Sequence, residues 1–287
     1  MRLMYNMYSL SILKNYKNAV TSGDKSLGNI SSGKKLNSAK DNPSKIVESD
    51  KLKINIQSRQ AAKDGVQDAN SMIQTFDGAY QEMNNNMSRL KQLVVQAGNG
   101  SISESDRADI QKEIEGVKNS INDLANNTSF NGIKLSLPDD PNEGTTGAID
   151  TNTSTIKSTV GVQADEFMEI PFYHVTTKGL NIDNIDVSGA NPNIDSYLDQ
   201  VDAATKQVDL IRSKYGAIET NLDDTLNSYD DMNDTLQAAQ SDLEDSDISS
   251  EMEKYSSSEV MVKAGISLMS QSNQLPQDCV NLLISSL

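Results

Sequence analysis

The residues that could do chemistry in this chain are few, and their spacing fits no catalytic or metal-binding motif. His174 is the single histidine, so the H-E-x-x-H site of a zinc protease cannot form, and no nucleophile elbow supports serine hydrolysis. Cys279 is the single cysteine, has no histidine nearby and is expected to be a buried thiol. The acidic run of residues 242–251 lacks the glycine that a calcium-binding loop needs at its sixth position. We therefore expect no enzyme activity, no metal site and no cofactor.

The composition of the 287 residues excludes several classes of partner. The net charge of -16 and the pI of about 4.4 argue against nucleic acid, whose phosphates need clustered Lys and Arg. No apolar run of about eighteen residues occurs, so we expect no membrane-spanning helix. Residues 1–6 have neither a continuous apolar region nor a small-residue cleavage site, and we do not expect a Sec signal peptide.

The longest regular feature is an apolar stripe whose gaps alternate between three and four. Because 3.6 residues make one helical turn, this spacing returns the apolar side chains to one face of a long helix. We predict this helix over residues 44–97, with Pro43 in its first turn and Asp41 or Asn42 as its cap. The stripe comprises Val66, Ala69, Ile73, Phe76, Tyr80, Met83, Met87, Leu90, Val94 and Ala97.

Two further stripes predict the helices that cover this face. Gly98 and Gly100 end the first helix, and the short turn makes the next helix, with apolar residues from Ile110 to Leu124, antiparallel to it. A stripe over residues 194–243 supplies a partner of nearly the same length as the first helix. Together they predict a mainly α fold, an elongated antiparallel helical bundle or coiled coil.

A stretch after the third helix interrupts the helical pattern. Asn131-Gly132 between apolar neighbours predicts a hairpin turn. Residues 167–175 and 180–187 are rich in β-branched and aromatic residues and are predicted to be short strands. We therefore expect residues 138–193 to form a small β-hairpin insert on the bundle rather than a second domain.

Both ends of the chain are predicted to be amphipathic helices without evident cover inside one chain. A polar connector over residues 31–43 follows the first helix, and Pro276 should kink or end the last one. Because the bundle has its own core, the two end faces indicate a partner surface. The first stripe, over residues 3–30, is Leu3, Met7, Leu10, Leu13, Tyr16, Val20, Leu27 and Ile30. The last stripe is Met261, Ala264, Leu268, Gln271 and Leu275.

Charge is divided unevenly along the chain. Residues 1–64 carry twelve Lys and Arg against five Asp and Glu, whereas residues 195–254 carry four against sixteen. This asymmetry suggests that the two ends lie near one another or near each other's copies. Two independent solvated faces would have the same composition.

Short motifs at both ends resemble the bacterial flagellin family, over about residues 1–137 and 195–287. Residues 42–45 and the opening residues 1–5 depart from the family pattern. The motifs are residues 30–41 (ISSGKKLNSAKD), 69–73, 84–100 (NNNMSRLKQLVVQAGNG), 128–135 (TSFNGIKL), 243–247 (LEDSD) and 264–277 (AGISLMSQSNQLPQ).

The resemblance implies a structural subunit that polymerises with its own copies into the extracellular flagellar filament for motility. It implies secretion through the flagellar type III channel, assembly beneath a cap, an export chaperone for the last helix, and pairing of the two terminal helices. The large variable outer domains of many flagellins are missing. The implied domains are a polymerisation helix with its connector (1–43), two rod segments (44–137 and 194–243), the insert (138–193) and a second polymerisation helix (244–287).

Three residues match the site through which a toll-like innate receptor recognises some flagellins: Arg89, Leu93 and Glu113. The residue before Leu93, acidic in the family, is Gln92 here. Alternatively, Arg89 and Glu113 are solvated residues that face each other across two helices. Two other functions stay open for the chain: a hook–filament junction protein, and a secreted adhesin or receptor ligand that acts as a monomer.

Overall fold

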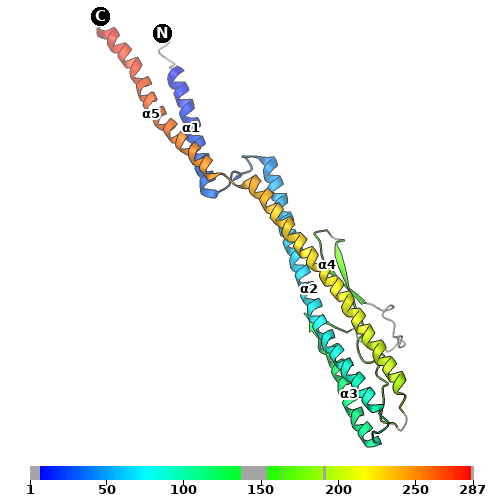
Figure 1. The fold of residues 1–287 in the computed structure, drawn as a ribbon. Coiled ribbons are helices and arrows are strands. Elements are labelled where there is room, and N and C mark those ends of the chain that lie inside the picture. The colour runs from blue at the N-terminus through cyan, green and yellow to red at the C-terminus, as the bar shows by residue number, and fades with distance from the viewer. Residues whose placement is uncertain (1–6, 137–153, 164, 190–191, 286–287) are drawn as a thin grey trace. The chain divides into compact units, whose positions relative to one another are not determined.

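The computed structural model describes residues 7–136, 154–163, 165–189 and 192–285, and the side chains only as far as residue 274. The described residues form five helices and two two-stranded sheets (Figure 1). They fall into two compact units, which we call the rod unit (Gln57–Asn233) and the terminal unit (Met1–Ile56 with Asp234–Leu287). Helices α2 (Pro43–Ala97) and α4 (Ile194–Glu244) contribute to both units. The predicted mainly α bundle with a small β insert is confirmed.

The core of the rod unit lies between α2, α3 (Glu104–Asn127) and α4. Every residue of the predicted stripe from Val66 to Ala97 is buried, as the spacing requires. From α3, Ile110, Ile114 and Ile121 enter the same core. The Ser103 side chain accepts a hydrogen bond from Asp106 N at 3.2 Å and begins α3. The α4 contribution is Val201, Ala204, Val208, Ile211, Tyr215, Leu222 and Tyr229.

A ladder of polar pairs joins α2 to α4 along the rod unit. In each pair a residue of α2 donates a hydrogen bond to an aspartate of α4, and the two Asn–Asp bonds measure 2.8 Å. Steps of seven or fourteen residues forward on α2 match equal steps backward on α4, which is the repeat of an antiparallel heptad seam. The predicted antiparallel partnership of these helices is therefore confirmed. The pairs are Lys63–Asp230, Asn70–Asp223, Asn84–Asp209 and Lys91–Asp202.

The predicted hairpin turn at Asn131-Gly132 is confirmed. Strands β1 (Ser129–Phe130) and β2 (Ile133–Lys134) pair antiparallel, and Asn131 and Gly132 take φ of 49° and 83° between them. Two adjacent residues with positive φ match the twist of a tight hairpin, and asparagine and glycine tolerate this conformation best.

The insert differs from the prediction in its second strand. β4 (Phe167–Phe172) lies in the predicted strand, but it pairs with β3 (Ser154–Thr159), a segment not expected to be a strand. The expected strand over residues 180–187 is wrong: Leu180, Ile182, Ile185 and Val187 are buried, yet the backbone is irregular. In place of a neighbouring strand, side chains of α3 hydrogen-bond to the backbone of this segment. Gln111 Oε1 accepts from Val187 N at 2.9 Å, and Lys118 Nζ donates to Asp183 O at 2.7 Å.

Aromatic residues bind the insert to the rod core. The Tyr215 hydroxyl donates to Pro171 O at 2.8 Å, and the Tyr229 hydroxyl donates to Val160 O. Phe76 packs edge-to-face on Phe172 with ring centroids 5.7 Å apart. The described insert is therefore part of the core rather than an appendage.

The terminal unit contains α1 (Met7–Ser32) and α5 (Ile248–Ser285), which lie side by side as expected (Figure 1). The apolar stripe of α1 has no cover inside the described chain, as expected: Met7, Leu10, Leu13 and Leu27 are exposed, and Leu3 lies outside the described residues. Of the two effects expected of Pro276, a kink or an end of the helix, the end is wrong, since α5 continues to Ser285. Proline removes one backbone hydrogen bond, which a long helix with intact turns on both sides tolerates.

Candidate assembly surface

Small and polar side chains form the seam between α1 and α5, which together we call the terminal pair. On α5 the buried residues recur at every seventh position, and on α1 they recur at gaps of three or four. A Cβ added at Gly23 would lie 3.4 Å from the Ser258 Cβ, so the two helices approach closely. The seam therefore covers little large apolar surface. Its residues are Ala19, Gly23, Ser26 and Asn29 of α1 and Glu251, Ser258, Gly265 and Ser272 of α5.

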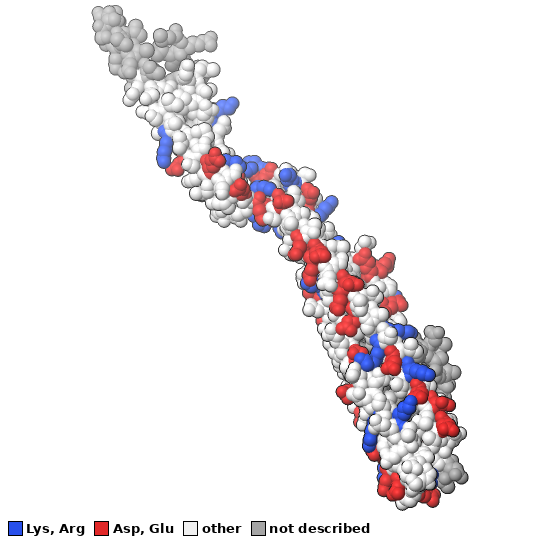
Figure 2. Space-filling view, viewed as in Figure 1, with Lys and Arg blue, Asp and Glu red and all other residues white. Residues whose placement is uncertain are grey.

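Large apolar side chains of the terminal pair point away from this seam. Tyr8 is 81% exposed and Met7 72% on α1, and Val260 is 63% exposed on α5. Figure 2 shows charged side chains only sparsely over the described part of these two helices. An apolar surface of this kind marks a site that another protein covers. The other exposed residues are Leu10, Leu13, Leu27, Ile248, Met252, Met261, Ile266 and Leu268.

Two short segments that lead into the terminal pair bind each other through their backbones. Gly33 takes a φ of 71° and ends α1, a conformation that glycine adopts without a steric penalty. Lys35 N then donates to Glu244 O at 2.7 Å, and Ser246 N donates to Gly33 O at 2.9 Å. These bonds hold the two segments against each other within the terminal unit.

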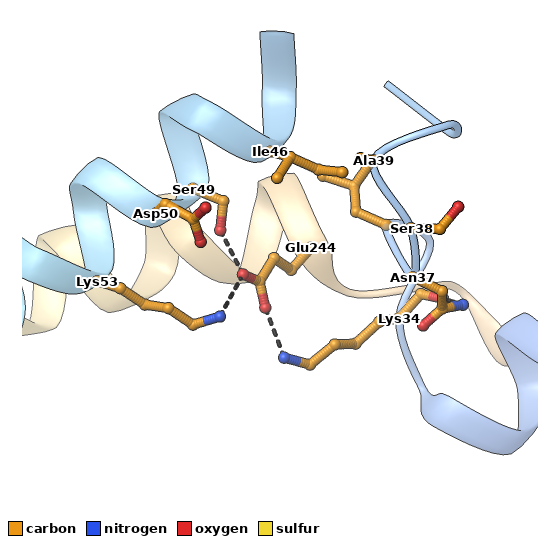
Figure 3. A pocket seen from close by; sticks show the side chains of 10 residues that line it. Lys34, Asn37, Ser38, Ala39, Ile46, Ser49, Asp50, Lys53 and Glu244 are labelled. Atoms are coloured by element: carbon orange, nitrogen blue, oxygen red, sulfur yellow. Dashed lines mark hydrogen bonds and ion pairs between the residues drawn. The ribbon is translucent and has the colours of Figure 1, made fainter. Parts of the chain in front are cut away.

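The Glu244 side chain lines an open pocket of about 180 Å³ next to this crossing (Figure 3). Its Oε2 accepts from Lys34 Nζ at 2.6 Å, and its Oε1 accepts from Lys53 Nζ at 3.0 Å and from the Ser49 hydroxyl. The hydrogen bonds from Lys34 and Ser49, with that from Lys53, lower the pKa of Glu244 to about 2. The carboxylate thus stays ionised and joins the connector, α2 and α4.

The predicted connector is a polar, non-helical segment, but it covers residues 33–42 rather than 31–43, because α1 continues to Ser32 and α2 begins at Pro43. Its side chains hydrogen-bond within the segment and to its neighbours. The Asp41 carboxylate accepts from Ser38 N at 3.0 Å and pairs with Lys25 at 3.0 Å, and these contacts lower its pKa. Asn42 is the cap of α2, because its Oδ1 accepts from Lys45 N at 3.2 Å. The sequence motif of the connector therefore has a structural role.

Among the described residues, those considered for chemistry form no metal site. His174 lies half-buried in an irregular segment after β4, and Cys279 belongs to the residues whose side chains are not described. In the described part of the chain, no group of three His, Cys, Asp or Glu side chains could hold a metal ion. No helix within the described ranges is long and apolar enough to cross a membrane.

Comparison with known proteins explains both ends of the chain. Residues 3–136 match the bacterial flagellin N-terminal helical region, and residues 198–283 match the bacterial flagellin C-terminal helical region. A flagellin of Xenorhabdus nematophila is 32% identical over 88% of this chain and 90% of its own length. The chain belongs to the bacterial flagellin family. A flagellin of Bacillus subtilis (strain 168) is 28% identical over 99% of this chain and 100% of its own length.

This flagellin is a structural subunit of the extracellular flagellar filament, polymerises with its own copies and is not an enzyme. A flagellar hook-associated protein from Vibrio parahaemolyticus shares its fold, with a TM-score of 0.59 and 14% identity over 71% of this chain and all of that chain. That likeness concerns the fold alone. Because relatives named flagellin match nearly the whole chain, a hook–filament junction protein and a monomeric adhesin are not favoured.

The three residues matched to a receptor site lie close together on α2 and α3 of this flagellin, but they differ in exposure. Arg89 Nε donates to Glu113 Oε1 at 3.0 Å, and both side chains are about half exposed. Arg89 also donates to Gln92 Oε1 at 3.5 Å. Leu93 is fully buried in the rod core. The surface at this place therefore consists of the ion pair, with Leu93 beneath it.

Sequence reasoning missed the polar residues that organise the terminal unit. Glu244 and Glu251 are buried carboxylates, and neither was expected to have a role in the fold. The signal that could have found the second is the heptad of Glu251, Ser258, Gly265 and Ser272, which runs through α5 at a spacing typical of a helix seam. Because its residues are small or polar, this heptad does not appear in a pattern of large apolar residues.

Proposed function

We propose that the outward apolar faces of α1 and α5 are the surfaces through which copies of this flagellin bind one another in the filament. The supporting observation is the arrangement of the terminal pair, in which short side chains fill the seam and long apolar ones face outward. A monomer in water gains no stability from such an arrangement, whereas a polymer removes those side chains from water.

The size of this surface suits polymerisation. Among the residues whose side chains are described, five large apolar residues on α1 and six on α5 are exposed. Full burial of one such side chain contributes about 1.5–3 kcal/mol. Since these side chains are only partly exposed, covering the whole surface contributes a free energy of the same order as the roughly 4–15 kcal/mol of freedom that a subunit loses on association.

We propose that the segments of this flagellin have the roles that the family resemblance implies. Residues 1–43 and 244–287 polymerise, residues 44–137 and 194–243 form the rod, and residues 138–193 form the short variable insert. Before assembly, the exposed face of α5 needs cover, which supports an export chaperone for this helix. Passage through the flagellar type III channel and addition beneath a filament cap are the corresponding steps of secretion and growth.

We also propose that a host toll-like receptor contacts the rod at Arg89 and Glu113. The exposure and pairing of the two side chains support a surface role. Leu93 then acts by holding α2 in the core beneath them.

The exchange of one exposed valine tests the assembly surface. Val260→Asp places a charge on the outward face of α5, and we expect the full chain to stay helical but to form no filaments in electron micrographs. The matched control is Val162→Asp, at the exposed end of the β3–β4 hairpin, which should polymerise like the wild type. Normal filaments from the Val260→Asp chain would contradict the proposal.

A further inference from the structure

The seam of the terminal pair contains little that distinguishes one alignment of its helices from another. Ala19, Gly23 and Ser26 on α1 and Ser258 and Ser272 on α5 are all short. Coiled coils whose seam residues are alike tolerate a slip by one heptad, because small residues again meet small residues. A filament of identical subunits, however, needs the same outward surface on every copy, so one alignment must be favoured.

Two contacts define the alignment that the structure has. Gly23 lies against Ser258, and the Tyr16 side chain lies against Gly265, where an added Cβ would be 3.5 Å from the Tyr16 Cβ. Tyr16 lies seven residues before Gly23, and Gly265 lies seven residues after Ser258, so the two contacts are one heptad apart on antiparallel helices. In the opposite direction, the residue seven before Ser258 is Glu251, and the residue seven after Gly23 lies in the last turn of α1.

Glu251 is the buried carboxylate at this end of the seam, with an exposed fraction of 8%. Lys254 Nζ donates to its Oε1 at 2.7 Å, and Ser26 and Asn29 of α1, both buried, hydrogen-bond to it. The bonds from Lys254, Ser26 and Asn29 lower the pKa of Glu251, so the buried group is ionised. Asn29 is itself held, since its Oδ1 accepts from Asn37 Nδ2 at 3.0 Å.

We propose that Glu251 is the specificity-determining residue that sets the alignment of α1 on α5. A slip of one heptad in one direction brings Ala19 and Ser22 to the places of Ser26 and Asn29, so Glu251 keeps one hydroxyl donor from α1 in place of two donors. A slip in the other direction brings residues beyond Ser32, the end of α1. Both leave the buried carboxylate with fewer α1 donors than the observed alignment gives it, which is costly. A single buried polar group that specifies alignment in this way is well known in coiled coils.

The proposal rests on the proposed function only in taking the terminal pair as the polymerising element. The test therefore reads alignment directly, by disulfide cross-linking of the full chain with Cys279→Ser, both before and after assembly. Gly23→Cys with Ser258→Cys reports the observed alignment, because their Cβ atoms would be 3.4 Å apart, close to the usual disulfide separation. Ile30→Cys or Tyr16→Cys with Ser258→Cys reports a slip of one heptad in either direction.

With Glu251 present, we expect the first cysteine pair to cross-link and the two slip reporters to remain reduced. Glu251→Leu should keep the helices packed but reduce the first cross-link by more than half and produce cross-links in a slip reporter. Glu251→Gln, which keeps a hydrogen-bonding group, should retain the first cross-link, and Glu253→Leu, at an exposed position of the same helix, should change nothing. An undiminished first cross-link in Glu251→Leu, or none in the parent chain in either state, would overturn the proposal. Loss of filaments in Val260→Asp with the first cross-link intact would leave the two proposals separately supported.

Discussion

Lys34 Nζ lies 2.6 Å from Glu244 Oε2, although the two residues are 210 positions apart in the sequence. The contact joins the connector after α1 to the last residue of α4. Ser49 and Lys53 of α2 bind the other oxygen of the same carboxylate. Residues from the basic first part of the chain thus meet the acidic part near its end, as the uneven charge suggested for two ends that lie close together.

Replacement of Glu244 by glutamine should weaken the terminal unit in a pH-dependent way. The folded-state pKa of Glu244 is about 2, below its ordinary value of 4.5, so its contribution is present above pH 4.5 and is lost as the pH falls through 2. We expect Glu244→Gln to lower the free energy of unfolding by about 2 kcal/mol at neutral pH. The difference from the wild type should shrink between pH 4.5 and 2, as measured by urea unfolding followed by circular dichroism. Glu253→Gln is the control, and equal stability of both variants at pH 7 would refute the role of Glu244.

Removal of the Tyr215 hydroxyl should loosen the insert. Tyr215 is buried and donates to Pro171 O at 2.8 Å, so Tyr215→Phe leaves a buried carbonyl without this donor. We expect a loss of about 1–2 kcal/mol in thermal unfolding. Tyr197→Phe, on the same helix but only partly buried, should cost less than about 0.5 kcal/mol. Equal effects of the two changes would show that this hydrogen bond does not hold the insert on the core.

The rod was predictable because its helices follow a single rule. Large apolar residues at gaps of three and four go inward, and the stripe from Val66 to Ala97 obeys this rule at every position. The hairpin at Asn131-Gly132 was predictable because two positive φ values demand those residue types. Local chemistry and global packing agree at these places.

The terminal helices do not follow this rule, in agreement with the expectation that their apolar faces have no cover inside one chain. Tyr8 and Leu10 face water in one chain, while Gly23 and Ser26 form the seam, so the most apolar face of α1 is not the intramolecular one. Periodicity shows that a face is apolar but not what covers it. The expected strand over residues 180–187 failed for a related reason, since its alternating burial comes from contact with α3 and not from a neighbouring strand.

The candidate site was predictable only in outline. The sequence indicated that both chain ends carry an apolar face that a partner covers. The exposed side chains of Met7 and Val260 agree with this. The roles of Glu244 and Glu251 depend on residues that come together only after folding, such as Lys34 and Ser26. The heptad through α5 marks the position of Glu251 but not its partners, and Glu244 has no such pattern around it.

Recognition by a toll-like receptor would depend on the ion pair of Arg89 and Glu113. Arg89→Ala should reduce the response of receptor-expressing reporter cells to monomer without unfolding the rod, because the side chain is exposed. Lys112→Ala, which removes an exposed ion pair with Asp109 on α3, is the matched control. A wild-type monomer that gives no response, with Arg89→Ala equally silent, would exclude receptor recognition at this site.

Electron microscopy of chains without one terminal helix tests the assembly surface most directly. Chains that lack residues 1–40 or 248–287 keep the rod core from Val66 to Tyr229, so circular dichroism should show a folded helical protein. After salting out, the full chain is expected to form filaments, and either shortened chain is expected to form none. Filaments from either shortened chain would show that the contacts between subunits lie elsewhere.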